Sequence, residues 1–308
     1  MHAVIVAADG TALAAARESR LVTWWRSCAK PFQVMPLLDS GGFDALGWGE
    51  DELALATASH GGEPEHVEVA ASMLESLGLE EGDLACGPHE PLTSRGVRML
   101  RESGERATRL HNNCSGKHSA MLALARQGGH SLSGYERAGH PVQEASAECV
   151  ARWTGVRRED LLQATDGCGV VVFGLPLYNM ALAYARLADA HRRDDEVPSR
   201  VVEAIRDRPF IFAGTDRFDT VMLEASGGRV LAKIGAEGVH TAAVLDSGIG
   251  VAVKVEDGSP RAQYPALIAA LQHVGALDEP LSSRLQEFLA RPVRNSRGEV
   301  VGSVELVR

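Results

Sequence analysis

The placement of the β-prone runs constrains the fold of this chain more than any other feature, because these runs gather at its two ends. Residues 3–8 and 11–15 flank an Asp-Gly pair, a pattern that predicts a β-hairpin with a primed turn. A further short apolar run covers residues 21–25. Towards the other end, short runs follow one another at the spacing of a β-meander, and a closing strand comes last (229–234, 241–245, 250–255 and 300–307).

The middle of the chain has the pattern of helices. Apolar residues recur at helical spacing, and prolines stand at helix starts, where the missing N–H is tolerated. The predicted helices cover residues 31–38, 64–77, 118–127, 175–190, 198–205, 264–274 and 281–289, and another begins at Pro141. Strands at both ends with helices between them predict an α+β fold. In it, both chain ends form an antiparallel sheet with flanking helices, and a helical subdomain is inserted.

This order also predicts the domain organisation. We expect a single catalytic unit over residues 1–308. Its approximate subdivision is a sheet subdomain, residues 1–60 and 210–308, and a mainly helical subdomain, residues 61–209.

Composition excludes several classes of protein. The 31 Lys and Arg against 41 Asp and Glu leave a net charge of −10, and without a basic cluster the chain is a poor ligand for the phosphates of nucleic acids. No run approaches the roughly 18 apolar residues of a membrane span, and the first residues do not have the pattern of a signal peptide. Five scattered cysteines do not form a disulfide framework, so we expect a reducing cytoplasm.

Several segments combine reactive side chains with glycine or proline. The first reads Arg26-Ser27-Cys28-Ala29-Lys30-Pro31. Ser27 and Lys30 are three residues apart, so on a helical turn their side chains share one face. A lysine desolvated beside another cation can be neutral near pH 7 and can then take the proton of a serine hydroxyl. Taken alone, however, this spacing more often marks an exposed helix start.

Two further segments place polar residues beside glycines. Residues 57–64 contain Ser59 and His60 in a small-residue loop before a proline-led helix, whose N–H groups and dipole suit an anionic substrate. A helix cap without function is the competing interpretation. Residues 232–238 place Lys233 at a strand end before a glycine-bounded loop. An exposed lysine on a strand face is the alternative there.

The last two segments contain cysteines. Residues 110–118 read Leu-His-Asn-Asn-Cys-Ser-Gly-Lys-His, a density of donors and soft ligands that packing does not require. Residues 166–169 read Asp-Gly-Cys-Gly. Cys114 and Cys168 can bind a soft metal such as zinc as thiolates, although the chain has no Cys-x-x-Cys pair. Buried small side chains or a catalytic cysteine are the alternatives.

Together these segments resemble the L-asparaginase II family, also called the rhizobial type. The matching residues follow one another along almost the whole chain (26–33, 59–62, 86–89, 111–118, 166–169 and 233–238). Each motif is modestly specific, whereas the ordered set is highly specific. The resemblance implies a fold like that of serine β-lactamases and glutaminases. It also implies hydrolysis of the side-chain amide of L-asparagine to L-aspartate and ammonia.

The resemblance implies a site in which two Ser–Lys pairs meet. The matching pairs here are Ser27 with Lys30 and Ser59 with Lys233. We expect one of the two serines to attack the amide carbon with a lysine as its base, and N–H groups of the Gly-rich loops to stabilise the oxyanion. The candidates for holding the substrate are Arg26, His60, Asn113, Asp166, Gly235 and Glu237.

The family also has a zinc site formed by two cysteines and a lysine. The matching residues are Cys114, Lys117 and Cys168. A neutral lysine ligand is reasonable because the cation itself suppresses protonation of the amine. We expect the zinc to brace residues 114–117 against the loop of Cys168, and so to position Asn113 and Asp166, rather than to act on the substrate.

Other functions fit parts of the same pattern. Glutaminase activity differs by one methylene in the substrate, which a pocket distinguishes by only about 1–3 kcal/mol. An amino-acid or metal sensor would not need both Ser–Lys pairs, and a penicillin-interacting enzyme would not need the Cys114, Lys117 and Cys168 set. Related enzymes suggest a homodimer. Family members carry a further N-terminal segment, so we expect this chain either to lack that segment or to begin late.

Overall fold

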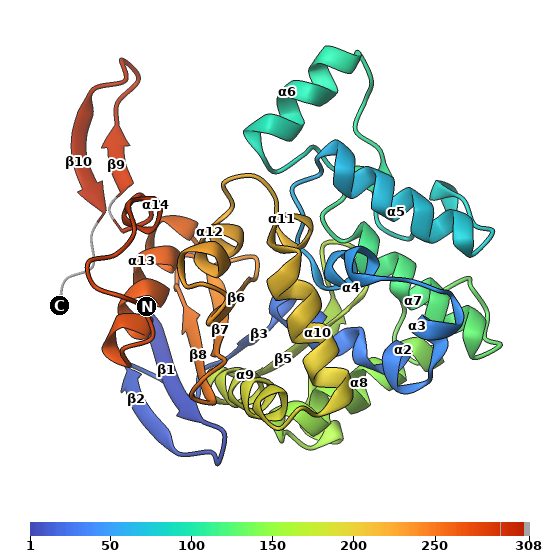
Figure 1. Ribbon diagram of the computed structural model, residues 1–308, viewed down its shortest axis with the longest axis horizontal. Coiled ribbons are helices and arrows are strands. Elements are labelled where there is room, and N and C mark those ends of the chain that lie inside the picture. The colour runs from blue at the N-terminus through green and yellow to red at the C-terminus, as the bar shows by residue number, and fades with distance from the viewer. Residues whose placement is uncertain (290, 305–308) are drawn as a thin grey trace. The chain divides into compact units, whose positions relative to one another are not determined.

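The computed structural model describes residues 1–289 and 291–304, which fold into two units (Figure 1). The first unit contains Met1–Cys28, Leu175–Arg193 and the described chain from Val221 onward. The second contains Ala29–Gly174 and Asp194–Thr220. The mixture of helices with an antiparallel sheet places the fold in the α+β class, as the sequence predicts. Among the described residues, no helix has both the length and the apolar character to cross a bilayer.

The first unit is built on a five-stranded antiparallel sheet (Figure 1). Its strands, in spatial order, are β2 (Ala12–Ala16), β1 (His2–Ala7), β8 (Ile249–Lys254), β7 (Val239–Val244) and β6 (Val230–Ile234). The N-terminal hairpin therefore joins the C-terminal meander through β1 and β8, where Val4 pairs with Ala252. This confirms that both chain ends form one antiparallel sheet.

Two helices pack on this sheet, α9 (Leu177–Arg192) and α13 (Pro260–His273), and both contact β1, β7 and β8. Every residue of β7 is buried, which requires cover on both faces because successive side chains point to opposite sides. The approach of α9 is so close that a Cβ on Gly250 would lie 1.9 Å from the carbonyl oxygen of Ala181. Glycine is therefore required there.

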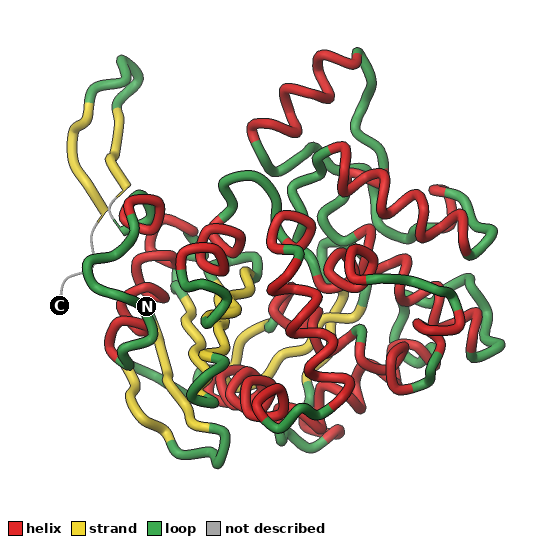
Figure 2. Tube along the Cα trace, in the orientation of Figure 1, coloured by secondary structure: helices red, strands yellow, loops and turns green. Residues whose placement is uncertain are grey.

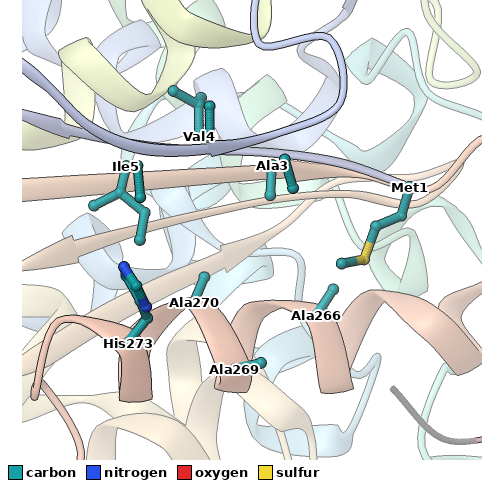
Figure 3. Close-up of a pocket in the computed structure, with 11 residues that line it drawn as sticks. Met1, Ala3, Val4, Ile5, Ala266, Ala269, Ala270 and His273 are labelled. Carbon is teal, nitrogen blue, oxygen red and sulfur yellow. The ribbon is translucent and has the colours of Figure 1, made fainter. Parts of the chain in front are cut away.

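The edge strand β2 is mostly exposed. Beside it, a pocket of about 230 Å³ lies between β1, β2 and α13. Figure 3 shows Ala3 and Ile5 of β1 facing Ala266 and Ala270 of α13 across this pocket. Small alanine side chains at this corner leave the space that larger residues would fill.

The C-terminal part differs in two ways from the prediction. The predicted strand 300–307 is present as β10 (Val300–Val304), but it pairs with β9 (Arg291–Arg294) in a separate two-stranded hairpin (Figure 2). Residues 305–307 of that prediction lie outside the described residues. The predicted helix 281–289 is reduced to α14 (Ser283–Gln286), which precedes residues in turn conformation.

Helix α4 (Glu50–Thr57) lies at the centre of the second unit. It contacts α1 (Lys30–Gln33), α5 (Pro64–Ser76), α7 (Ser115–Gln127), α10 (Glu196–Asp207) and α11 (Pro209–Phe212). Its residues from Leu53 to Thr57 are all buried. A Cβ on Gly116 would lie 2.4 Å from the carbonyl oxygen of Leu55, so α7 passes α4 at the closest approach that glycine allows. The unit also contains α2 (Met35–Asp39), α3 (Gly42–Ala45), α6 (Ser94–Ser103) and α8 (Pro141–Thr154).

Two predictions for the middle of the chain need correction. The single helix expected over 31–38 is divided into α1 and α2 at Val34, because Pro36 lacks the N–H that would continue the first helix. The middle section also contains an antiparallel hairpin of β4 (Leu162–Thr165) and β5 (Val171–Pro176). The helix predicted from residue 175 consequently begins at Leu177.

Candidate active site

In the first unit, the Ser27 motif is fixed to the end of β6. Ser27 lies in a 3-10 helix, η1 (Arg26–Ala29), and is partly exposed. The neighbouring Cys28 is buried, and its thiol donates to the carbonyl oxygen of Lys233 at 3.0 Å. Its own carbonyl accepts from the hydroxyl of Tyr184 at 2.8 Å. The cysteine inside the motif therefore holds the Ser27 and Lys233 segments side by side.

Lys233 is fully buried in β6, although the sequence allowed an exposed strand face. Its Nζ donates to the carbonyl oxygen of Ile234 at 3.1 Å. Gly235 follows, and a Cβ there would lie 3.0 Å from Cys28 Sγ. The carbonyl of Gly235 accepts from Gln263 at 3.3 Å. A side chain at residue 235 would thus separate the two segments.

Arg26 and Glu237 form an ion pair at 3.1 Å in the same unit. Both have left-handed backbones, with φ of 51° and 62°. Such a conformation costs a non-glycine residue on the order of 1–3 kcal/mol and persists where the surroundings enforce it, often at functional sites. Arg26 lies beside Ser27, and Glu237 lies in the loop after Lys233. Two strained residues in contact therefore favour a functional site at this edge of the unit.

In the second unit, Lys30 joins two of the predicted segments. It begins α1, its side chain is 1% exposed, and it donates to the carbonyl oxygen of Ala58. Its Nζ lies 3.3 Å from Ser59 Oγ and 3.1 Å from the carbonyl oxygen of Asn113. Burial lowers the pKa of Lys30, because desolvation disfavours the ammonium ion. The structure thus brings Lys30 to Ser59, which sequence spacing does not suggest.

His60 is fully buried and uses both ring nitrogens inside the unit. Its Nδ1 accepts from the backbone N–H of Gly62 at 3.1 Å, and its Nε2 lies 2.9 Å from Ser115 Oγ. The neutral tautomer with a proton on Nε2 satisfies both contacts. Burial also holds the pKa of His60 well below its usual value. The imidazole therefore connects the Ser59 loop to the start of α7.

The cysteine segments also meet in the second unit, where Cys114, Lys117 and Cys168 are all buried. Lys117 Nζ lies 3.0 Å from Cys168 Sγ. A hydrogen bond from Cys114 and the Lys117 charge lower the pKa of Cys168. Burial opposes the charge of Lys117, but the neighbouring Cys168 and Cys114 outweigh it and raise the pKa of the lysine.

The two remaining substrate candidates border this cluster. Asn113 Oδ1 accepts from the Cys114 thiol at 3.1 Å. Asp166 begins the tight turn between β4 and β5, and its Oδ1 accepts from the N–H of Gly167 at 2.8 Å. The turn closes at Gly169, whose φ is 92°, so glycine is required for Cys168 to point to Lys117.

The donor set of this cluster limits which metals it can hold. All five cysteines are buried and free of disulfides, and no three His, Cys, Asp or Glu side chains converge on one point within the part of the chain that the structure describes. Beside the two cysteines, the amine of Lys117 is the nitrogen donor that lies next to a candidate ligand, 3.0 Å from Cys168 Sγ. Two sulfurs and one nitrogen suit zinc, a borderline-soft ion.

Sequence reasoning missed one buried cluster of the second unit. Glu63 is fully buried and binds both Arg95 and Thr215. The motif of residues 57–64 includes Glu63, but its partners lie 32 and 152 residues away. A glutamate before a proline-led helix looks like a cap, so no local signal could have found this role.

A serine hydroxyl within reach of a buried lysine is the arrangement of amide and ester hydrolases that use serine as the nucleophile. The chain belongs to the L-asparaginase II family, whose model matches residues 1–306 of 308, and this confirms the resemblance. No individual curated protein gives a significant match. The family suggests amidohydrolase activity on asparagine and thus a small amino-acid substrate.

Proposed function

We propose that this protein hydrolyses the side-chain amide of L-asparagine to L-aspartate and ammonia through an acyl-enzyme. The observation that carries the proposal is the 3.3 Å contact between Lys30 Nζ and Ser59 Oγ, both buried, in a chain of the L-asparaginase II family. Burying a charged lysine costs several kcal/mol of desolvation. A role in proton transfer explains why a lysine stands at such a position.

In the first half-reaction, a serine Oγ bonds to the amide carbon while its proton passes to a lysine amine. The tetrahedral intermediate then collapses, the C–N bond breaks, and the same proton leaves with the nitrogen as ammonia. In the second half, water adds to the ester carbon, a lysine takes its proton, and the serine regains a proton as aspartate departs. Ser27 and Ser59 are the candidate nucleophiles, and Lys30 and Lys233 are the candidate bases.

The inferred pairs are Ser27 with Lys30 and Ser59 with Lys233. The contact of Lys30 with Ser59 adds a third combination, in which Lys30 serves Ser59 directly. Replacing each serine separately by alanine identifies the nucleophile, and replacing Lys30 and Lys233 separately by methionine identifies its base.

The substrate's α-amino and α-carboxylate groups need charged and polar partners. We assign these contacts to Arg26, Asn113, Asp166, Gly235 and Glu237. The pairing of Arg26 with Glu237 supports this assignment, because an arginine suits the carboxylate and a glutamate the ammonium group. His60, with both nitrogens in internal hydrogen bonds, is assigned to orienting the loop of Ser59.

We also propose a zinc ion held by Cys114, Lys117 and Cys168. The 3.0 Å contact of Lys117 with Cys168 and the burial of all three side chains support it. Bound zinc could supply Lewis acidity or a rigid cross-link between segments. We assign it the role of a cross-link. The ligands would hold the turn of Asp166 against the start of α7, next to Asn113, and turnover needs no step on the metal.

The family resemblance carries further proposals. They are a fold of the serine β-lactamase and glutaminase type, a homodimer, and a cytoplasmic location. Sedimentation of the purified chain tests the dimer, and localisation of a tagged chain in cells tests the compartment.

The function is tested by ammonia release from L-Asn and L-Gln and by cleavage of a β-lactam, for the wild type and for the Ser27→Ala and Ser59→Ala variants. We expect ammonia from L-Asn, and a loss of at least about 10³-fold in kcat for the variant that lacks the nucleophile. Trapped acyl-enzyme, seen by mass spectrometry, should disappear in that variant alone. Ammonia from L-Gln only, or lactam cleavage, would overturn the proposed substrate.

A further inference from the structure

Glu63 differs from the other carboxylates near the site because its side chain is completely buried. It is the N-cap residue of α5, yet its carboxylate does not cap that helix. Its backbone N–H instead donates to His66 Nδ1 at 3.1 Å. An ionised carboxylate out of water is costly unless its oxygens are fully hydrogen-bonded. The carboxylate of Glu63 must therefore serve contacts outside its own helix.

Those contacts come from two distant segments of the same unit. Oε1 accepts from the backbone N–H of Thr215 at 2.8 Å, and Oε2 from the hydroxyl of Thr215 at 2.7 Å. Arg95, near the start of α6, donates to Oε2 at 2.6 Å. These bonds hold the pKa of Glu63 below its usual value, although burial acts in the opposite direction. One carboxylate thus ties the Ser59 loop to α6 and to the segment after α11.

The surrounding backbone is fitted to this carboxylate. A Cβ on Gly61 would lie 3.0 Å from Glu63 Oε1 and 2.6 Å from a methyl of Thr93. A Cβ on Gly214 would lie 2.8 Å from the same oxygen. The carbonyl of Gly61 also accepts from the N–H of Leu92 at 2.8 Å. Glycines at both positions let the two loops close around the charge.

We propose that Glu63 is a positioning residue: its buried negative charge fixes the loop of residues 59–63 so that Ser59 Oγ stays in reach of Lys30 Nζ. This inference rests on the proposed function, in which Ser59 and Lys30 take part. The path is short, because only three residues separate Ser59 from Glu63 and His60 anchors the loop between them on Ser115. Displacement by about 1 Å can cost an enzyme ~10²-fold in rate.

The test compares Glu63→Gln with Glu65→Gln. Arg95 binds both carboxylates, but Glu65 is 43% exposed, whereas Glu63 is fully buried and also accepts both hydrogen bonds from Thr215. Glutamine keeps the size of the side chain and removes the charge. Its NH₂ group replaces one carboxylate oxygen, so at least one of the three hydrogen bonds from Arg95 and Thr215 is lost. We expect kcat to fall about 10–100-fold in Glu63→Gln with KM within about twofold, and no more than a twofold change in Glu65→Gln.

Amide hydrogen exchange provides a readout that does not depend on activity. In Glu63→Gln, the peptide covering residues 59–63 should exchange at least about tenfold faster, since its closing bonds are weakened. The peptide of β7 in the first unit should not change. Should the variant fail to fold, Thr215→Val removes one bond to the same carboxylate and is read in the same way, with smaller changes.

The outcomes separate this inference from the proposed function. Faster exchange with lower kcat supports the positioning role. Unchanged exchange, or faster exchange with unchanged kcat, overturns it. If the wild type releases no ammonia, the proposed function fails, and the exchange of residues 59–63 alone decides whether Glu63 fixes the loop.

Discussion

Two lysines of the second unit occupy equally buried positions but face opposite surroundings. Lys30 is 1% exposed and Lys117 is 4% exposed. Lys30 donates to oxygen atoms of Ala58, Ser59 and Asn113, whereas Lys117 donates to the sulfur of Cys168. Burial lowers the pKa of Lys30, while the thiols of Cys168 and Cys114 overcome burial and raise that of Lys117.

The difference shows that neighbours, rather than burial, decide what a buried lysine does. For Lys30, desolvation and the charge of Lys117 lower the pKa and outweigh the opposite effect of Cys114 and Cys168, which favours a neutral amine. A thiolate stabilises the ammonium ion of a neighbouring lysine, and once that lysine has lost its proton the thiolate and the neutral amine can bind a metal together. The chain contains only four lysines, of which Lys30, Lys117 and Lys233 are buried. Arginine supplies most of the surface cations, so lysine is concentrated where its chemistry is needed.

The largest expected effect is that of Lys30→Met. Methionine fills a similar volume but cannot hydrogen-bond, so the carbonyl oxygens of Ala58 and Asn113 lose a donor, which costs about 1–3 kcal/mol. We expect ammonia release from L-Asn to fall at least about 10³-fold, as for loss of a general base, while the urea midpoint of unfolding falls only modestly.

Lys30→Arg is the matched control, because arginine keeps the positive charge but does not lose its proton. We expect it to be as inactive as Lys30→Met and less stable, since the larger guanidinium must enter a filled site. Activity above about a tenth of wild type in Lys30→Arg would show that Lys30 supplies charge and not proton transfer.

Much of the first unit follows from local sequence. The hairpin of β1 and β2 is signalled by an Asp-Gly turn, and β6, β7 and β8 by short apolar runs at regular spacing. The hairpin of β4 and β5 is not signalled by the local sequence. β4 is exposed along its length, so it lacks a buried face that a run of large apolar residues would mark. The pairing of β10 with β9 instead of the main sheet depends on tertiary packing that periodicity does not contain.

The same distinction holds for the site. The motifs single out the segments of Ser27, Lys30, Ser59 and the cysteines as candidates, because their residue types are unusual beside glycine and proline. The motifs do not predict which segments contact one another in the folded chain. Lys30 contacts Ser59 across 29 residues, and Glu63 contacts Thr215 across 152. No spacing rule relates such residues, so their contacts appear only in the folded chain.

For Lys117→Met we expect a smaller loss of activity than for Lys30→Met, but a larger loss of stability. Removing one partner of a buried pair leaves Cys168 without its cation, which costs about 3–5 kcal/mol in the free energy of unfolding. We expect the urea midpoint to fall, zinc content to drop, and kcat to decrease about 10–100-fold, the usual range when support of a metal site is lost.

A double-mutant cycle with Cys168→Ser separates this pair from general packing. The two changes together should cost clearly less than the sum of the single changes, because each removes the same interaction. Additive costs, with metal content unchanged in every variant, would show that Lys117 and Cys168 are neighbours without a shared role.

The smallest expected effect concerns His66, a buried base of the same unit whose pKa, like that of Lys30, is lowered by burial. His66 Nδ1 accepts from the N–H of Glu63 and its Nε2 lies 2.9 Å from the carbonyl oxygen of Phe210, so a second ring proton would face a donor. Burial lowers the pKa of His66, although Glu63 and Glu65 act in the opposite direction and Arg95 adds to the lowering.

Because the folded pKa of His66 is below the unfolded value of about 6.5, the unfolded chain binds more protons at acidic pH. The free energy of unfolding should thus be fully retained above pH 6.5 and decline as the pH falls below it. His60 acts in the same direction, because burial and the charges of His66, Lys30, Arg217 and His111 lower its pKa as well. Urea unfolding at pH 7.5, 6.5 and 5.5 measures this decline.

His66→Asn is the control. Asparagine presents an acceptor near the position of Nδ1 but does not titrate, so the difference in the free energy of unfolding between wild type and His66→Asn should narrow as the pH falls. A constant difference over this range would mean that His66 titrates equally in both states, and that the rule drawn from Lys30 does not extend to the imidazoles around it.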